Sequence, residues 1–580
     1  MVHSLGLNEL FCFICGVSFE INRIRTKDEP LDSASGPPTH FENQELTWCG
    51  GLGGSWGECR QDGCRLVYRG PTKYVWRDEY NSQNVYDSDS DDSTYKYSSD
   101  VVDDPLEYDS AAEGSAEDDE PSPSQDVEMQ DADDSPQETL GDDKPWTFSV
   151  WGPEPSGQLW PLSKADEIPE GPEHWIKYAR QWEYEHIAGP DCTNAAGYHG
   201  DRVSALEMSG CTAIQCLVAK KPYWEARDDD EDFERHSRWH LTGLSNHVWR
   251  ETELRFTPNR HGAVKVTASH YYDLPQEDEL DAEFGIAFHP TCFELFKIES
   301  LRVFGRVDVD SLVRLRMSHR GVSFPEDDFV DRHRDAIEGR IDRDWKHYVG
   351  REYLACNPIF VPGLRQLCEE AVSRDEAFHP QQSAFGFRQP TPYRGSSHDP
   401  FLRLPTDIIY LLLPLLSNKD IASLRLSSRA FEHLPISLWF KLLKRDYPCL
   451  FEAWSEHAKP SKWAYLNPAQ LIQEARAEKE FKAEYHFRRN VIKEYYPEVL
   501  PAWDANEVKD PPSTYHDLIH QTAREREAME PISLPYHSTN WYQLYCSIRA
   551  NWGSLKGLQN RARIYADVMQ IVDEMKSHRD

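Results

Sequence analysis

The stretch FCFICGVSF, residues 11–19, decides how the N-terminal part of this chain folds. It carries Cys12 and Cys15 in a C-x-x-C arrangement, with Gly16 directly after the second cysteine. Such a turn supplies two of the four ligands of a tetrahedral zinc site. Two further ligands must then come from elsewhere in the chain, and finding them predicts which distant segments meet.

A second pair of metal-binding residues lies in FHPTCFELFKI, where His289 and Cys292 open a predicted amphipathic helix. A helix N-terminus favours the thiolate form of cysteine that a metal requires. Two ligands from a turn and two from a helix start form treble-clef-like zinc sites. The long separation is tolerable because the entropy of loop closure grows only logarithmically with length. We therefore predict one structural zinc ion bound by Cys12, Cys15, His289 and Cys292.

Two alternatives stay open at this stage. A local site could combine the first pair with Cys49, Cys59 or Cys64, or the cysteines could be buried thiols without a metal. Either metal site would be structural, since four protein ligands leave no open position for catalysis.

Charge is distributed very unevenly along the 580 residues. The net charge is -36, but residues 87–143 alone hold 22 acidic residues and one lysine, a net charge of -21, which leaves -15 for the rest. Such a segment cannot bury enough apolar surface to offset its ordering entropy, so we expect residues 81–145 to be a disordered acidic linker. Because nucleic-acid binding needs basic surfaces, we expect no nucleic-acid partner.

The apolar runs and the cysteines bear on where in the cell the chain is expected to reside. No apolar run approaches the length of a membrane span, and we see no signal peptide, so no membrane partner is expected. Thirteen scattered cysteines favour reduced thiols in the cytoplasm or nucleus.

The pattern along the chain predicts an α+β multidomain protein. Residues 201–219 and 253–272 favour strands, the acidic stretch 227–240 between them should be exposed, and amphipathic helices follow from 291 onward. The predicted units are a cysteine-bearing N-terminal module (1–80), the acidic linker (81–145), a β-containing central domain packed with the first module (146–300), a helical segment (301–380), a linker (381–399), a three-helix unit (400–446) and a helical C-terminal region (447–580).

The three-helix unit is FLRLPTDIIYLLLPLLSNKDIASLRLSSRAFEHLPISLWFKLLKRDYPCLF, residues 401–451. Pro405 suits the first position of a helix, Pro414 should kink or shorten that helix, and Ser417 can cap the next. Ser427 or Ser428 can cap a third helix. Three helices in under 50 residues cannot bury all of these leucines among themselves, so part of the apolar surface should face a partner.

The run resembles an F-box. The matching residues are Leu404-Pro405, Asp407, Ile408-Ile409, Leu412, Leu416, Asp420, Leu424, Ser428-Arg429 and Leu438-Trp439. The resemblance implies docking on the Skp-type adaptor of an SCF (Skp–cullin–F-box) ubiquitin ligase. The implied adaptor-facing or core positions are Leu404, Pro405, Ile408, Ile409, Leu412, Leu416 and Leu424, with Trp439 closing the third helix.

The remainder of the chain is similar to a group of fungal F-box proteins. The shared segments are Cys12 to Gly16, Ser209 to Val218, His289 to Phe296 and Asn551 to Ile564. The resemblance implies a non-catalytic subunit that presents an unknown protein substrate for ubiquitination. The rival hypothesis is a zinc-stabilised interaction or regulatory protein outside any ligase, and an enzyme in the central domain is a third.

Other histidines and cysteines give weaker patterns. His236 and His240 are spaced for one helix face but are predicted to be surface residues. His186, Cys192 and His199 share a polar loop and are interpreted in the same way.

Overall fold

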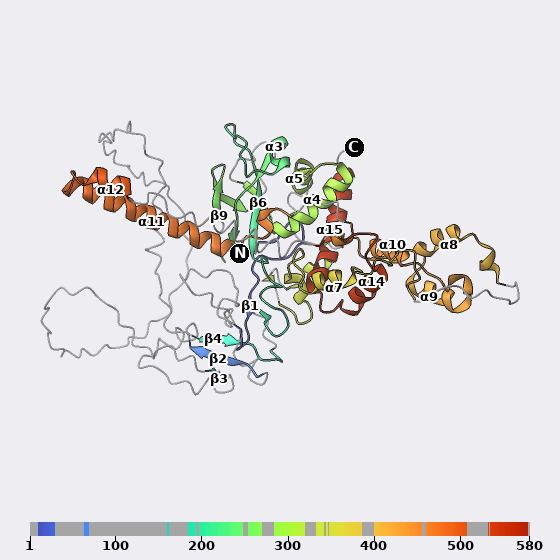
Figure 1. The fold of residues 1–580 in the computed structure, drawn as a ribbon. Coiled ribbons are helices and arrows are strands. Elements are labelled where there is room, and N and C mark those ends of the chain that lie inside the picture. Colours follow the sequence, from blue (N-terminus) through green and yellow to red (C-terminus); the bar gives the residue numbers. More distant parts are fainter. Residues whose placement is uncertain are drawn as a thin grey trace, which may run out of the picture. The chain divides into compact units, whose positions relative to one another are not determined.

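The computed structural model describes residues 10–29, 63–68, 159–161, 184–192, 197–246, 253–268, 284–318, 332–341, 344–345, 347–385, 399–454, 460–506, 532 and 534–577 (Figure 1). All of them fall in one compact unit made of Met1–Thr72 and Glu154–Asp580. The fold is mixed helix and sheet, as predicted. The acidic linker, 81–145, lies outside the described residues. None of the described helices is long and apolar enough to cross a bilayer.

The main sheet has six strands in the order β7-β6-β11-β10-β9, with β8 also paired to β6. β10 runs parallel to β11, whereas β6 pairs antiparallel with β11 and with β7. The strands are β6 (Ala213–Ala219), β7 (Trp239–Leu241), β8 (Ser245–Asn246), β9 (Glu253–Arg260), β10 (Ala263–Ala268) and β11 (Phe284–Phe288).

Two of these strands differ from the sequence prediction. The strand expected over 201–219 begins only at Ala213, because residues 201–212 form turns. The strand expected over 253–272 is a hairpin, broken by His261 and Gly262, which both have positive φ angles. Two such residues make the tight turn whose twist matches antiparallel strands.

Three smaller sheets join segments that are far apart in sequence. β1 (Arg23–Ile24) pairs with β5 (Tyr198–His199), and β12 (Arg340–Ile341) pairs with β13 (Asp344–Trp345). The third has the order β3-β2-β4, formed by β2 (Arg65–Tyr68), β3 (Leu159–Pro161) and β4 (Tyr184–Ile187).

The helices predicted after residue 290 are present. α4 (Pro290–Phe304) follows β11 directly, and the C-terminal helix α15 (Lys556–Ser577) packs on α4 and on α5. The Tyr565 hydroxyl of α15 lies 2.7 Å from a carboxylate oxygen of Glu299 in α4. The other helices outside 399–506 are α3 (Asp232–His236), α5 (Val309–Ser318), α6 (Arg334–Ile337), η5 (Glu352–Ala355), α7 (Leu364–Ala371) and α14 (Trp541–Ala550).

Residues 400–446 form short helices. They are η6 (Pro400–Arg403), α8 (Thr406–Leu412), η7 (Leu413–Leu415), α9 (Asn418–Ser427), η8 (Arg429–Phe431) and α10 (Ile436–Asp446). α8 gives way to a 3-10 turn at Pro414, and the Ser417 side chain caps α9, both as predicted. The third helix starts later than predicted, because Ser428 caps η8 and α10 begins after Pro435.

Beyond residue 446 the described chain is largely helical. Besides α14 and α15 it contains η9 (Phe451–Ala453), η10 (Lys462–Ala464), α11 (Pro468–Tyr495) and α12 (Leu500–Asn506).

The acidic stretch 227–240 is not an exposed segment throughout, which corrects the sequence prediction. Asp230 and Glu234 are buried and bind the buried guanidinium of Arg260 at 2.6 and 2.9 Å. Burial of these carboxylates is tolerated because Arg260 compensates their charge. His240 is also buried and lies on β7, whereas His236 ends α3 at the surface.

Candidate metal centre

The turn around Cys12 and Cys15 is held by backbone hydrogen bonds. The Cys12 N–H donates to the Val17 carbonyl at 2.9 Å, and the Gly16 N–H donates to the Cys12 carbonyl at 2.8 Å. Gly16 has a φ of +70°, a left-handed conformation that glycine adopts at no steric cost. The Phe13 N–H donates to the Ala287 carbonyl at 3.0 Å, which attaches the turn to the end of β11.

The other two residues stand at the start of α4. His289 is the N-cap, Pro290 occupies the first turn, and the Cys292 N–H donates to the His289 carbonyl at 3.0 Å. Proline suits this position because its missing N–H has no partner inside the helix. β11 therefore delivers His289 and Cys292 directly to the turn that carries the other cysteines.

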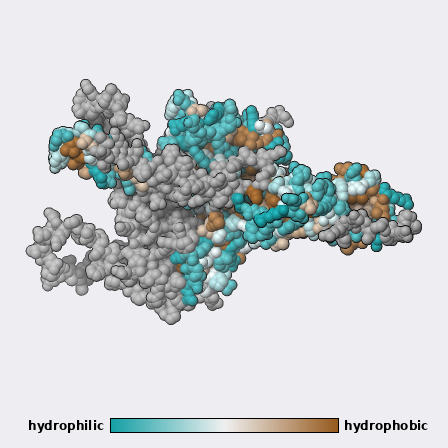
Figure 2. Space-filling model, in the orientation of Figure 1, coloured by the Kyte–Doolittle hydropathy of each residue, from teal (hydrophilic) through white to brown (hydrophobic). Residues whose placement is uncertain are grey.

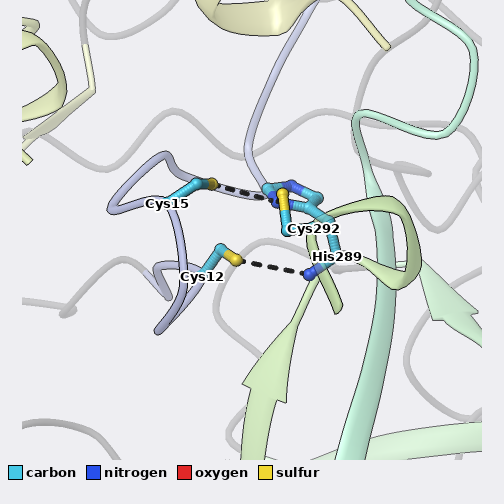
Figure 3. A group of neighbouring side chains, drawn as sticks. All are labelled: Cys12, Cys15, His289 and Cys292. Atoms are coloured by element: carbon cyan, nitrogen blue, oxygen red, sulfur yellow. Dashed lines mark hydrogen bonds between the residues drawn. The ribbon is translucent and has the colours of Figure 1, made fainter. Parts of the chain in front are cut away.

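The structure brings all four predicted ligands together (Figure 3). Cys12, Cys15, His289 and Cys292 are buried, and their ligand atoms all lie within 4.8 Å of one another. The Nδ1 atom of His289 is 3.5 Å from Cys15 Sγ and 3.8 Å from Cys292 Sγ. Ordinary zinc–sulfur and zinc–nitrogen bonds at tetrahedral angles put such N···S pairs about 3.6 Å apart. The cluster therefore has the donors and spacing to hold a metal ion.

Neighbouring groups orient the imidazole. His289 Nε2 lies 2.8 Å from the Cys211 carbonyl oxygen, which can only accept, so Nε2 carries the proton and Nδ1 is left to face the sulfurs. The Phe19 ring packs against the imidazole with centroids 4.4 Å apart. The backbone N–H of His289 also points at Cys12 Sγ, at 3.3 Å.

The four side chains strongly perturb one another's protonation. Burial raises the pKa of Cys15, but hydrogen bonds with Cys12 and Cys292 and the charge of His289 bring it well below its usual value. Burial lowers the pKa of His289, but its interactions with the neighbouring cysteines raise it to about 10. Burial and the neighbouring cysteines raise the pKa of Cys292 well above its usual value. A divalent metal would replace these protons as the balancing charge.

Among the described residues, Cys64 does not join Cys12 and Cys15 in a local site. Cys49 and Cys59 lie outside the described residues, and Cys64 clusters instead with His186 and Cys192. The sequence did not reveal that these three residues cluster.

The residues expected to face an adaptor are exposed, half-buried or buried. Leu404, Pro405, Ile408 and Leu412 are exposed, Ile409 and Trp439 are buried, and Leu416 and Leu424 are half-buried. Four further leucines are exposed, and the F-box resemblance did not include them: Leu402, Leu411, Leu415 and Leu426. Leu415 is 80% exposed and Leu426 is 91% exposed. Figure 2 shows hydrophobic residues gathered on this part of the surface, at the right of the view.

The buried tryptophan ties this segment to helix α14. The Trp439 ring lies 4.8 Å from the Tyr542 ring and 5.2 Å from the Tyr545 ring, centroid to centroid. The Tyr545 hydroxyl also donates to Asp446 at the end of α10, at 2.6 Å. α10 is thus anchored, while α8 and α9 keep apolar side chains exposed.

Comparison with known proteins finds little likeness. No family model and no solved structure matches the chain. A stretch of 47 residues is 40% identical to the mitochondrial ATP-dependent RNA helicase mss116 of Aspergillus oryzae, which covers 8% of this chain and 7% of the helicase. The match supports no argument about function.

Proposed function

We propose that the chain is an F-box adaptor, the substrate-recognition subunit of an SCF-type ubiquitin ligase. The observation that supports this most is the apolar surface of residues 400–427, which combines F-box-like spacing with side chains that the rest of the described chain leaves uncovered. Leu411, Leu415 and Leu426 are each more than 60% exposed. Exposed apolar patches of this kind mark sites of protein association.

The occupant we propose is a Skp-type adaptor. Ile409, Leu413 and Ile421 of the segment are buried in the hydrophobic core, whereas the exposed leucines lie outside it. Burying one leucine side chain on a partner contributes about 1.5–3 kcal/mol. Several together can support a stable complex, after the cost of association is met.

In this role the chain would do no chemistry of its own. It would hold a protein substrate near the charged ubiquitin thioester of other subunits, raising the local concentration of the substrate's lysines. The rival function, an interaction protein outside any ligase, would use the same metal-stabilised fold without the adaptor.

We also propose that the Cys12, Cys15, His289 and Cys292 cluster holds one structural Zn²⁺. Three thiolates and one imidazole are ligands that zinc prefers, and they fill its four positions. The ion would tie the N-terminal turn to the start of α4.

The test of the F-box proposal is adaptor binding by purified full-length chain. A Leu404→Asp/Pro405→Ala variant should lose binding, because it places a charge and removes a ring on the exposed surface. A Phe487→Asp variant is the matched control, since Phe487 is also a large exposed apolar residue, 69% exposed, but lies on α11. The control should bind like wild type. Wild type that fails to capture the adaptor would reject the proposal, as would equal binding by the first variant.

A further inference from the structure

We propose that Cys64, His186 and Cys192 form a second metal site, which binds a thiolate-preferring divalent cation such as Zn²⁺. All three side chains are at least 98% buried, and their ligand atoms lie within 4.8 Å of one another. Two thiols and one imidazole are typical donors for zinc. The inference is independent of the F-box proposal.

The three residues come from separate parts of the chain. Cys64 directly precedes β2, His186 lies in β4, and Cys192 follows β4 after a turn in which its N–H donates to the Gly189 carbonyl at 3.1 Å. β2 and β4 pair antiparallel, with Leu66 opposite His186. More than 120 residues separate Cys64 from His186, so a local turn does not explain why they meet.

The atoms are spaced as at the first centre. His186 Nε2 lies 3.7 Å from Cys192 Sγ, and a tetrahedral zinc ion places such a pair about 3.6 Å apart. The Gly189 N–H points at Cys64 Sγ at 3.4 Å, just as the His289 N–H points at Cys12 Sγ at 3.3 Å. Donation of a backbone N–H to sulfur favours the thiolate form, which is the form that binds metal.

The imidazole of His186 presents Nε2 to the cysteines. Nε2 faces Cys192 Sγ at 3.7 Å, so it is the nitrogen that would bind the cation. Nδ1 would then carry the ring proton, because a neutral imidazole has one protonated nitrogen and one free to bind a metal.

A metal would also explain how the surrounding sheet is held. β2, β3 and β4 are four, three and four residues long, too short to form a large core of their own. A metal often replaces a core in small structures. Three protein donors leave one position of the tetrahedron to a further ligand, water included.

Metal content of the full-length chain tests the proposal. Elemental analysis of protein purified without added chelator should find two zinc ions per chain. His186→Ala and Cys192→Ser should each lower this to one, and so should Cys12→Ser at the first centre. Cys368→Ser is the matched control, because Cys368 is equally buried but lies in α7, outside both clusters. It should keep two.

A second measurement covers the case in which a variant fails to fold. Cobalt(II) bound to wild type absorbs in the near ultraviolet through its thiolate bonds, and Cys12→Ser should retain a thiolate–cobalt band from Cys64 and Cys192. The donor-preserving His186→Cys variant should keep two metal ions. A wild-type content of one zinc that His186→Ala leaves unchanged, a content of two in His186→Ala, or no cobalt–thiolate band in folded Cys12→Ser would overturn the second site.

Discussion

Gly16 illustrates how the cluster of Cys12, Cys15, His289 and Cys292 depends on single residues. Its φ is +70°, and a Cβ atom at this position would lie 2.8 Å from Cβ and Cγ of His333. The turn therefore excludes side chains for two reasons: the left-handed backbone and the packed histidine. Both were invisible in the sequence, where Gly16 was simply the residue after a cysteine pair.

Replacing this glycine tests both reasons. An alanine in the left-handed conformation costs about 1–2 kcal/mol. Gly16→Ala should lower the free energy of unfolding by more than this, because His333 must also move. Urea denaturation measures the difference. Gly305→Ala is the matched control, because Gly305 has a φ of +69° but nothing within 4 Å of the added carbon. Equal losses in the two variants would show that the contact with His333 is unimportant.

His240 should make stability depend on pH. Burial lowers its pKa from about 6.5 to about 4, with the nearby charges of His261 and Arg260 acting in the same direction. Above pH 6.5 the histidine is neutral in both the folded and the unfolded state. Between pH 6.5 and 4 the unfolded chain binds the proton more readily, so stability falls as pH falls. His240→Asn should flatten this part of a curve of unfolding free energy against pH, and an unchanged slope would contradict the assignment.

The two metal clusters show what can be inferred at the residue scale. The first was predictable because both of its pairs carry local signals, a C-x-x-C-G turn and a helix start. The second was not, because Cys64 was considered as a partner of Cys12 and Cys15, while His186 and Cys192 were interpreted, with His199, as residues of a polar loop. What brings them together is the pairing of β2 with β4, and strands of four residues leave too weak a pattern to reveal such pairing.

At the scale of elements, the helices of residues 400–446 were the easiest to predict, since proline and serine mark where they begin and end. Pro414 and Ser417 act as expected, whereas the start of α10 was missed because η8 intervenes. The strands were harder. The boundaries at Ala213 and at the His261–Gly262 turn depend on backbone conformation that composition alone does not show.

Trp439 should hold α10 on α14. Trp439→Ala removes the packing against Tyr542 and Tyr545, and large-to-small changes of this kind cost about 3–5 kcal/mol. Hydrogen exchange should then speed up across α8–α10 more than in α4. Trp439→Phe should lose less, because it keeps an aromatic ring between the two tyrosines. Unchanged exchange in the alanine variant would mean that other contacts anchor the segment.

At the scale of the whole molecule, Arg561 of α15 connects distant parts of the chain. It is fully buried, binds Glu452 at 2.9 Å and donates to the backbone carbonyls of Pro358 and Ile359. Arg563, two residues further along the same helix, donates to the Cys15 carbonyl at 2.8 Å. The C-terminal helix thus supports the N-terminal turn that carries Cys15, a connection that spans over 540 residues and that the units predicted from the sequence did not include.

Removing this arginine should affect the entire fold. Arg561→Met leaves Glu452 buried without its counter-charge and should cost about 3–5 kcal/mol. The double variant Arg561→Met/Glu452→Gln should recover part of the loss, because no uncompensated charge remains buried. Chemical denaturation measures both. A double variant less stable than the single one would show that the uncompensated charge of Glu452 is not the main cause of the lost stability.

The central claim is that the apolar surface of residues 400–427 binds a Skp-type adaptor. The most direct measurement is the mass of the complex formed when purified full-length chain and purified adaptor are mixed and separated by size-exclusion chromatography with light scattering. We expect one species with the mass of the 67.2 kDa chain plus one adaptor, and we expect it to be absent for Leu404→Asp/Pro405→Ala. Separate elution of the two wild-type proteins at micromolar concentration would contradict it.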